Sequence, residues 1–496
     1  WIGTRTRDPD ELESLRRALA DGMPQRVEAP GVVHSYSNYE ANLAGHLVEQ
    51  VSGLSYDQFV EENILQPLGM HGTTFRQPIP ETLAANLATG YSRKGGELQA
   101  APLAYAVMAP ASAATVTSID MAAFMIAHLH DGEYGNNRIL EQATIQGMHR
   151  QQFTHHPDMP GMTYGFKERY INGLRIIGHG GDIHTFASQM VLIPEEDLGL
   201  FVVYNRFDDA FREQLISAFF DHYYPAPVQD AVPQAIEVPL ASLERFAGRY
   251  RWVKYPRSTL GKAIAMVPGP YPIVVEANED ESLSLSFFGA KAEWRYVPVE
   301  PLVFKEVAGG PQLLDGLQVD PGDTLAFREN EAGEIAYGLV PLQNVAFEKL
   351  AWYEYPEVQL GTLGTLILLF VSAVVLLPLG ALIGRLRKRS RGGRPGSRLG
   401  LWVGWVVSDL NLVFLFVMLL SFGQDLVYGV PLSMRVILLV PIVTGVLSLV
   451  FLILAGKAWI RGTWPFVGRL YYSMIALAAV CFILFVGYWN MLGWRF

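Results

Sequence analysis

The fold of the first part of the chain is decided by residues 174–204, LRIIGHGGDIHTFASQMVLIPEEDLGLFVVY. Apolar runs at 174–178, 187–193 and 198–204 are separated by polar and glycine-containing stretches, which predicts three consecutive antiparallel strands. A helical pattern follows at 208–222. Because helical patterns also precede the strands, the order of the elements predicts an α+β fold.

The helices ahead of the strands are predicted from the spacing of apolar residues and from their ends. Residues 40–52 place apolar side chains three and four positions apart, and Gly53 follows as a natural helix stop. Ser55 stands where the N-cap of the next helix is expected. Residues 120–130 repeat the amphipathic pattern and end before an Asp-Gly pair.

The composition separates an acidic part from a basic, apolar tail. Only 17% of the 496 residues are charged, against roughly 25% in ordinary globular proteins, and the formal net charge is −10. Residues 358–496 contain 12 of the 38 basic residues and 2 of the 48 acidic ones, so the tail carries +10 and the remainder −20. This distribution excludes a single soluble domain, and the lack of a basic stripe excludes a nucleic-acid binder.

Four segments of the tail are long and apolar enough to cross a membrane as helices, which takes about 20 residues each. They lie at about 358–384, 399–423, 436–456 and 470–494. The connections after the first and third segments are basic and contain no acid, so the positive-inside rule places them in the cytoplasm. We therefore expect a multi-pass protein of the bacterial cytoplasmic membrane, with the lipid bilayer as a partner and the large N-terminal part on the extracytoplasmic side.

One acidic side chain interrupts the second of these segments. Asp409, beside Ser408 and near Asn411, would lie close to mid-membrane, where an ionisable group is costly and usually faces the bundle interior. Two interpretations stay open for it, a functional polar site and a hydrogen-bonding contact between helices.

The acidic part itself divides in two at a proline-rich segment. Residues 225–239 contain four prolines in fifteen positions, which predicts an extended linker between 1–224 and 240–352. The second piece alternates apolar and polar residues between turn clusters, as at 282–287, which predicts an antiparallel barrel or sandwich.

Two short motifs of the first piece gain meaning from their surroundings. Tyr36-Ser37-Asn38 stands just before the helix at 40–52, and His179-Gly180-Gly181 follows the strand at 174–178. Further matching residues follow each motif. After the first motif come Gly45, Val51-Ser52-Gly53 and Leu65-Gln66-Pro67-Leu68-Gly69-Met70, and after the second come Phe186 and Ser188. In this order and spacing, residues 1–222 resemble the serine β-lactamase and penicillin-binding-protein family, in particular its class C and D-aminopeptidase/esterase branch.

The resemblance implies an architecture of three domains. Residues 1–224 would form a β-lactamase-like or DD-peptidase-like domain, with a helical part and an antiparallel sheet. Residues 243–250 resemble the opening of the lipocalin-like β-domain that often follows such hydrolases, so a small domain of this kind is expected over 240–352. Residues 358–496 would form a four-helix transmembrane domain.

The nucleophile motif of the family, Ser-x-x-Lys, is absent, because no lysine of this sequence has a serine three positions before it. Family members place about a hundred residues, this motif included, ahead of the point that matches Trp1. We therefore expect an N-terminally truncated hydrolase domain that is inactive as it stands.

The resemblance assigns catalytic roles to three side chains. Tyr36 is expected to accept the proton of the serine and return it to the leaving group, beside the missing lysine, whose positive charge would depress the pKa of Tyr36. Asn38 is expected to orient the substrate amide. His179 is expected to hydrogen-bond the substrate or to tune Tyr36.

The remaining site residues are expected to shape the binding edge. Gly180 and Gly181 leave room for substrate along the strand, and the backbone N–H of Asp182 would be one oxyanion donor. No cofactor and no metal are expected, because no carboxylate or cysteine motif accompanies the histidines at 128, 130, 155 and 156.

Together these features predict a membrane-anchored serine hydrolase that hydrolyses or transfers amide or ester bonds through an acyl-serine. Small peptide, amide or ester substrates are expected, and D-amino-acid peptides are favoured by similarity to membrane-bound D-amino-acid peptidases. The alternative is a non-catalytic, penicillin-binding-like sensor or binding module coupled to a membrane domain.

Overall fold

The computed structural model describes residues 2–94, 96–183, 185–207, 209–226, 234–266, 272–287, 293–308, 312–314, 317–319, 323–341, 345–386, 395–421 and 423–496. The chain divides into two compact units. The first contains Arg5–Lys254 and Gly269–Leu350, and the second contains Trp1–Thr4, Tyr255–Pro268 and Ala351–Phe496.

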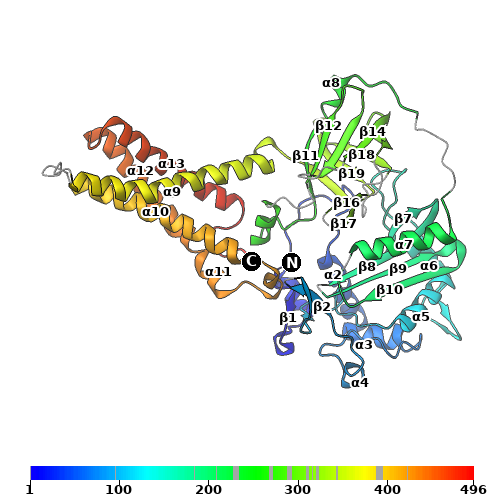
Figure 1. The fold of residues 1–496 in the computed structure, drawn as a ribbon. Coiled ribbons are helices and arrows are strands. Elements are labelled where there is room, and N and C mark those ends of the chain that lie inside the picture. The colour runs from blue at the N-terminus through cyan, green and yellow to red at the C-terminus, as the bar shows by residue number, and fades with distance from the viewer. Residues whose placement is uncertain are drawn as a thin grey trace. The chain divides into compact units, whose positions relative to one another are not determined.

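The first unit contains an antiparallel sheet of four strands, in the order β10-β9-β8-β7 (Figure 1). The strands are β7 (Lys167–Ile171), β8 (Leu174–Ile183), β9 (Phe186–Ile193) and β10 (Leu198–Tyr204). The three predicted strands are present, and β8 runs five residues beyond its predicted end. The fourth strand, β7, joins β8 through an Asn172-Gly173 turn in which both residues have positive φ, of 51° and 83°. Asn-Gly suits the primed turns that connect hairpin strands.

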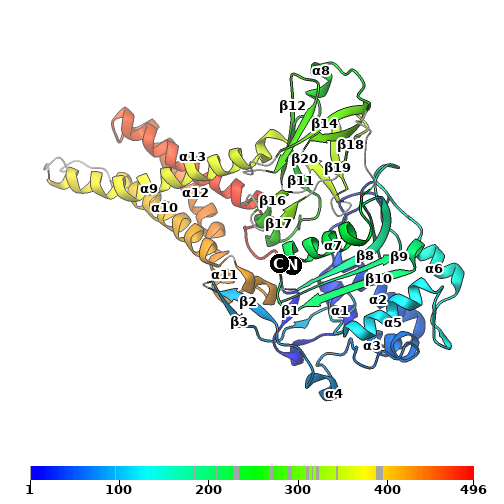
Figure 2. The ribbon, with the colours of Figure 1, turned by 45° about the vertical axis from the view of Figure 1, so that its right-hand side comes forward.

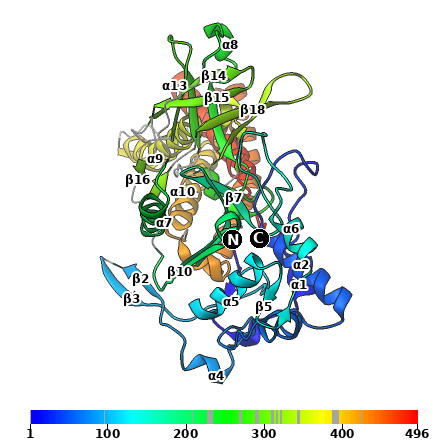
Figure 3. The same cartoon turned by 90° about the vertical axis from the view of Figure 1, so that its right-hand side faces the viewer.

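Both faces of this sheet are buried, which explains its apolar runs. Successive strand residues point to opposite faces. One face packs against α7 (Asp209–Tyr223), and the other packs against α5 (Ser118–Leu129); Figure 3 shows the sheet from the side. The α7 side buries Ile171, Ile176, Val191, Ile193, Ile216 and Phe220, and the α5 side buries Met125, Phe166, Ile177, Met190 and Leu192.

The helix ends follow the local signals of the sequence. Helix α2 (Asn38–Ser52) ends at Gly53, which has φ 75° and donates its N–H to the Glu49 carbonyl at 2.9 Å. Ser55 accepts the N–H of Gln58 and caps α3 (Tyr56–Val60), which continues as a π-helical turn over Glu61–Leu65. The smaller elements of this part are α1 (Leu15–Asp21), α4 (Glu81–Ala84), α6 (Gln142–His149), and the strand pairs β1 (Arg5–Thr6) with β4 (Tyr105–Ala106), β2 (Tyr91–Lys94) with β3 (Glu97–Ala100) and β5 (Glu133–Tyr134) with β6 (Asn137–Arg138).

A closed barrel of eight antiparallel strands forms the rest of the first unit. The strands are β11 (Gly248–Trp252), β12 (Ile273–Ala277), β13 (Leu283–Phe287), β14 (Glu293–Glu300), β15 (Val303–Ala308), β18 (Thr324–Glu329), β19 (Ile335–Val340) and β20 (Val345–Lys349). Strand β11 pairs with both β12 and β20, which closes the ring. The sequence left a barrel or a sandwich open, and the structure has the barrel. Its lipocalin-like character stays a prediction.

Aromatic side chains pack inside this barrel. Trp294, Tyr296 and Phe347 are fully buried, and the Tyr250 hydroxyl donates to the Phe246 carbonyl at 2.5 Å. Helix α8 (Leu240–Leu243) precedes the barrel and adds Leu243 to the same cluster. A short strand pair, β16 (Gln312–Leu314) with β17 (Leu317–Val319), accompanies the barrel strands. The predicted linker lies partly outside the described residues, which resume at residue 234.

Four long helices dominate the second unit (Figure 2). They are α9 (Pro356–Leu386), α10 (Pro395–Ser421), α12 (Val440–Arg461) and α13 (Phe466–Tyr488), with the short α11 (Leu432–Ile437) before α12. All four are long and apolar enough to cross a membrane. Each predicted segment is largely helical, although the fourth was predicted to reach residue 494 and its helix ends at Tyr488. The basic connection after the first lies largely outside the described residues.

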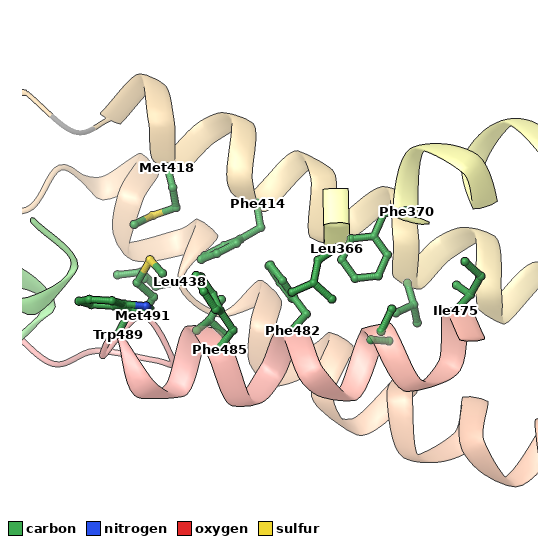
Figure 4. Close-up of a cluster of buried hydrophobic side chains, with 14 of the residues drawn as sticks. Leu366, Phe370, Phe414, Met418, Leu438, Ile475, Phe482, Phe485, Trp489 and Met491 are labelled. Carbon is green, nitrogen blue, oxygen red and sulfur yellow. The ribbon is translucent and has the colours of Figure 1, made fainter. Parts of the chain in front are cut away.

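The helices of the bundle meet through large apolar side chains (Figure 4). Phe370, Phe414 and Phe482 are fully buried where α9, α10 and α13 converge. Ser408 donates to the Gly404 carbonyl at 2.8 Å, and Asn411 is completely buried beside it on α10. Asp409 is half-buried. Neither interpretation of Asp409 is decided by these contacts.

One buried acid ties the helical part of the first unit together. Asp120 on α5 accepts hydrogen bonds from the Gly72 N–H at 2.8 Å and the Thr73 hydroxyl at 2.7 Å. Its own N–H donates to Thr117, the N-cap of α5. A buried carboxylate is stable only when such donors satisfy it.

Replacing Asp120 with Ala is expected to leave those buried donors without an acceptor, at a cost of about 3 kcal/mol. Hydrogen exchange followed by mass spectrometry should then show protection of the α5 amides falling about 100-fold. The exposed Asp21→Ala variant serves as the control and should leave this protection unchanged. Unchanged protection in Asp120→Ala would contradict the structural role.

Candidate active site

Tyr36 lies in the segment that leads into α2, and the start of that helix is fixed by hydrogen bonds. Asn42, which is buried, donates its side-chain amide to the Asn38 carbonyl at 2.7 Å. Its amide oxygen accepts the Ala111 N–H at 2.9 Å. The backbone two residues after Tyr36 is therefore held in place, while the side chain of Tyr36 is half-buried and Asn38 is exposed.

His179 lies on β8 just past Gly178, which pairs with Lys167, the first residue of β7. The pairing of β7 with β8 stops at Lys167 and Gly178, so the residues from His179 to Ile183 pair with β9 alone among the described strands. Gly178 is required at this point, because a Cβ there would lie 2.2 Å from the Met190 carbonyl oxygen. The result is an open strand edge that begins at His179.

The structure brings Tyr36 and His179 together, as the two motifs predict. Their ring centroids are 5.8 Å apart, with the ring planes tilted by 35°. Residues 36 and 179 thus meet at the open edge of β8, although 142 residues separate them along the chain.

The glycines and Asp182 continue along the same edge. Gly180 and Gly181 lie opposite Gln189 and Ser188 in the ladder with β9. The Asp182 carboxylate forms an ion pair with Arg212 of α7 at 2.5 Å, and Arg212 also donates to the Ser188 carbonyl at 3.3 Å. Arg212 is only 6% exposed, so it anchors this end of the strand. The oxyanion role of the Asp182 N–H stays a prediction.

Two lysines beside Tyr36 were not identified from the sequence. The Nζ of Lys167, the first residue of β7, lies 5.0 Å from the centroid of the Tyr36 ring. The Nζ of Lys254, two residues after β11 of the barrel, lies 4.3 Å from the same centroid. The Asn-Gly hairpin signal could have placed Lys167 opposite Gly178. No local signal could have found Lys254, because its position depends on how the barrel packs.

The surroundings set the protonation of this group. Burial raises the pKa of Tyr36, and the negative charge of Asp182 raises it further. Burial lowers the pKa of His179, and the charge of Lys167 adds to the effect. The expected depression of the Tyr36 pKa depends on the lysine of the absent Ser-x-x-Lys motif and stays a prediction; in this structure burial disfavours the phenolate. At neutral pH the site holds a neutral phenol and a neutral imidazole.

The lysines are perturbed as well. Burial lowers the pKa of Lys167 to about 8, with repulsion from Lys254 as the next cause. Burial also lowers the pKa of Lys254. A lysine that titrates near pH 8 can exchange a proton with a neighbouring phenol or imidazole, which suits acid–base chemistry.

The histidines considered as metal ligands have other contacts. His128 faces His149, with 3.2 Å between ring nitrogens. The Nε2 of His155 accepts the backbone N–H of His34 at 3.0 Å. Among the described residues, no three His, Cys, Asp or Glu side chains gather into a group that could hold a metal ion.

Replacing Lys167 with Met is expected to raise the pKa of His179, because it removes a positive charge that disfavours the imidazolium. The measurement is an NMR titration of 13C-labelled histidine, with the His179 signal assigned by its loss in His179→Gln. Lys305→Met, on the barrel strand β15, is the control and should leave the titration unchanged. An unchanged or lower pKa in Lys167→Met would contradict the described geometry.

The first part of the chain is similar to known proteins. The Beta-lactamase family model matches residues 3–219. A putative D-alanyl-D-alanine carboxypeptidase of Salmonella enteritidis PT4 (strain P125109) is 27% identical over 176 residues, covering 32% of this chain and 38% of that protein. The D-alanyl-D-alanine-carboxypeptidase/endopeptidase AmpH of Escherichia coli (strain K12) is 28% identical over 190 residues, covering 36% of this chain and 46% of that protein.

A solved structure adds a distant likeness. The class C beta lactamase from Rhodobacter sphaeroides has a TM-score of 0.35 and 21% identity, with 43% of this chain and 66% of that chain covered. The chain matches less than half of the length of each of the two curated relatives, the carboxypeptidase of Salmonella enteritidis and AmpH. From the family match and the named relatives, residues 3–219 belong to the serine β-lactamase and penicillin-binding-protein family.

Proposed function

We propose that this protein is a membrane-anchored serine hydrolase that hydrolyses or transfers amide or ester bonds through an acyl-serine. The observation that carries the proposal is the meeting of Tyr36 with His179 at the open edge of β8. Family membership of residues 3–219 supports the acyl-serine chemistry. Four helices of membrane-spanning length and composition support the anchor.

D-amino-acid peptides are the substrate class that we favour. The two relatives described above are named as D-alanyl-D-alanine carboxypeptidases. An open strand edge can also accept an extended peptide by backbone hydrogen bonding. The basic connections between the long helices support an orientation with the hydrolase part outside the cytoplasm.

Each residue of the site has a chemical role in the proposal. Tyr36 first passes its phenolic proton to the neutral form of Lys167, whose pKa is about 8. The phenolate, stabilised by the nearby ammonium groups of Lys167 and Lys254, then takes the proton of the serine and returns it to the leaving group. His179 accepts a hydrogen bond from substrate or from Tyr36. Asn38 orients the substrate amide, and the N–H of Asp182 stabilises the oxyanion.

The described site does not include the nucleophilic serine. Residues 1–496 contain no Ser-x-x-Lys, so we propose that these residues alone are inactive in acyl transfer. The reaction would need the motif from another segment of the gene product. A protein without it would act as a binding or sensing module.

The proposal is tested with the protein as its gene encodes it, in bacterial membranes, treated with a fluorescent penicillin and a fluorophosphonate. A label that depends on a serine is expected, and Tyr36→Phe should slow labelling about 100-fold or more, since a general acid–base group contributes that much. Tyr39→Phe is the matched control, because the Tyr39 hydroxyl only donates to the Leu19 carbonyl at 3.1 Å. Failure of both probes to label any serine would overturn the enzyme proposal and favour the binding module.

A further inference from the structure

The segment that leads to Tyr36 is held by hydrogen bonds to two other parts of the first unit. Arg328 of the barrel strand β18 donates to the Val32 carbonyl. The backbone N–H of His34 donates to the Nε2 atom of the His155 imidazole, at 3.0 Å. Because Tyr36 follows His34 by two residues, these contacts determine where the side chain of Tyr36 starts.

Apolar packing reinforces these hydrogen bonds. Val33, which lies between the two bonded residues, packs with Met159 of the loop over residues 151–163 and with buried residues of the barrel strands. Arg328 also donates to the backbone carbonyl of His155, at 3.3 Å. The segment, the loop and the barrel therefore meet at His155.

The loop that carries His155 is itself fixed to the hydrolase sheet. Glu168 of β7 is buried and accepts the backbone N–H of Gly161 at 2.8 Å. The same carboxylate accepts the side-chain amide of Gln151 at 2.5 Å, so both ends of the loop are bound to one residue. His155 is therefore held in place from β7, the strand whose first residue lies beside Tyr36.

The hydrogen bond from His34 requires that Nε2 of His155 carry no proton. A protonated imidazole has an N–H at both ring nitrogens, so it would turn a donor toward a donor. His155 is 8% exposed, and burial lowers its pKa to about 3, with the charges of His34 and Arg328 as the lesser causes. The titratable neighbours on its own loop are His156, whose Nδ1 accepts the N–H of Asp158, and the exposed Asp158 itself.

We propose that His155 is a positioning residue for Tyr36, and that its protonation in acid releases residues 32–36 and so switches the site off. This rests on the proposed function, in which Tyr36 moves the proton of the serine. The neutral imidazole ties the segment to the loop. The protonated imidazole repels Arg328 and no longer accepts the His34 N–H. Such a switch suits the extracytoplasmic side proposed for this part of the chain, where the pH follows that of the surroundings.

The direction of the pH dependence follows from the two states of the segment. In the released state His155 titrates near the ordinary histidine pKa of roughly 6.5. In the attached state it stays neutral until the pH approaches about 3. The released state therefore takes up a proton first as the pH falls, and the attached state loses stability between these two values. At pH 5 the equilibrium constant for release should be about 30-fold larger than at pH 8.

Hydrogen exchange followed by mass spectrometry measures this release, using the protein as its gene encodes it in detergent solution. After correction for intrinsic exchange rates, the protection of residues 32–36 should fall about 30-fold from pH 8 to pH 5. The fall should be absent in His155→Gln, because the glutamine oxygen accepts the same N–H and does not titrate. His156→Gln is the matched control and should keep the fall. An equal fall in His155→Gln, or no fall in the unaltered protein, would overturn the acid switch.

The effect on the site is measured by the rate at which the fluorescent penicillin labels the serine at pH 8. His155→Ala should lose the protection of residues 32–36 and slow labelling about tenfold or more, since small displacements of a reacting group have effects of this size. His155→Gln should restore the rate, and His156→Gln should not change it. Equal rates in His155→Ala and the unaltered protein would show that Tyr36 needs no such support, and the positioning role would be wrong.

The two proposals fail in different ways. If no serine is labelled by penicillin or fluorophosphonate, the proposed function fails and the positioning role fails with it. The acid-sensitive attachment of residues 32–36 is then judged by hydrogen exchange alone. If a serine is labelled but the exchange of residues 32–36 is the same at pH 5 and pH 8, the acid switch is wrong and the proposed function stands.

Discussion

The active-site region depends on one constraint, the close approach of β8 to β9 at Gly178. With a Cβ at this residue the strand could not pass the Met190 carbonyl. Because β7 begins opposite the same residue, β8 continues from His179 with one edge unpaired by any described strand. The edge presents His179 to Tyr36 and ends at Asp182, which Arg212 holds. The site therefore follows from where a strand stops and from the lack of a side chain at one residue.

The distribution of charge links the architecture to the chemistry. The acidic part carries −20 in total, yet two lysines lie beside Tyr36, and neither forms an ion pair with a carboxylate among the described residues. The chain also passes directly from Lys254 into the unit of the long helices, which begins again at Tyr255. In that unit the side-chain amide of Asn490 donates hydrogen bonds to the carbonyls of Arg257 and Thr259, at 2.9 and 3.0 Å.

The sequence predicted features that depend on local chemistry. The Gly53 stop, the Ser55 cap and the three strand runs are present because the signal and the structure lie within a few residues of each other. The pairing of Tyr36 with His179 was predicted from motifs in a family order. Lys254 was missed because its approach to Tyr36 depends on contacts between the barrel and residues 28–36. The rise of the Tyr36 pKa was not foreseen, because the burial that causes it cannot be read from a motif.

The central claim is that Tyr36 and His179 serve an acyl-serine reaction. The most direct measurement is mass spectrometry of the protein as its gene encodes it, after brief exposure to benzylpenicillin, with the modified residue mapped by peptide sequencing. The account predicts an adduct of one penicillin on a single serine, formed much more slowly in Tyr36→Phe than in Tyr39→Phe. The absence of an adduct, or an adduct on Lys167 or Lys254 in place of a serine, would contradict it.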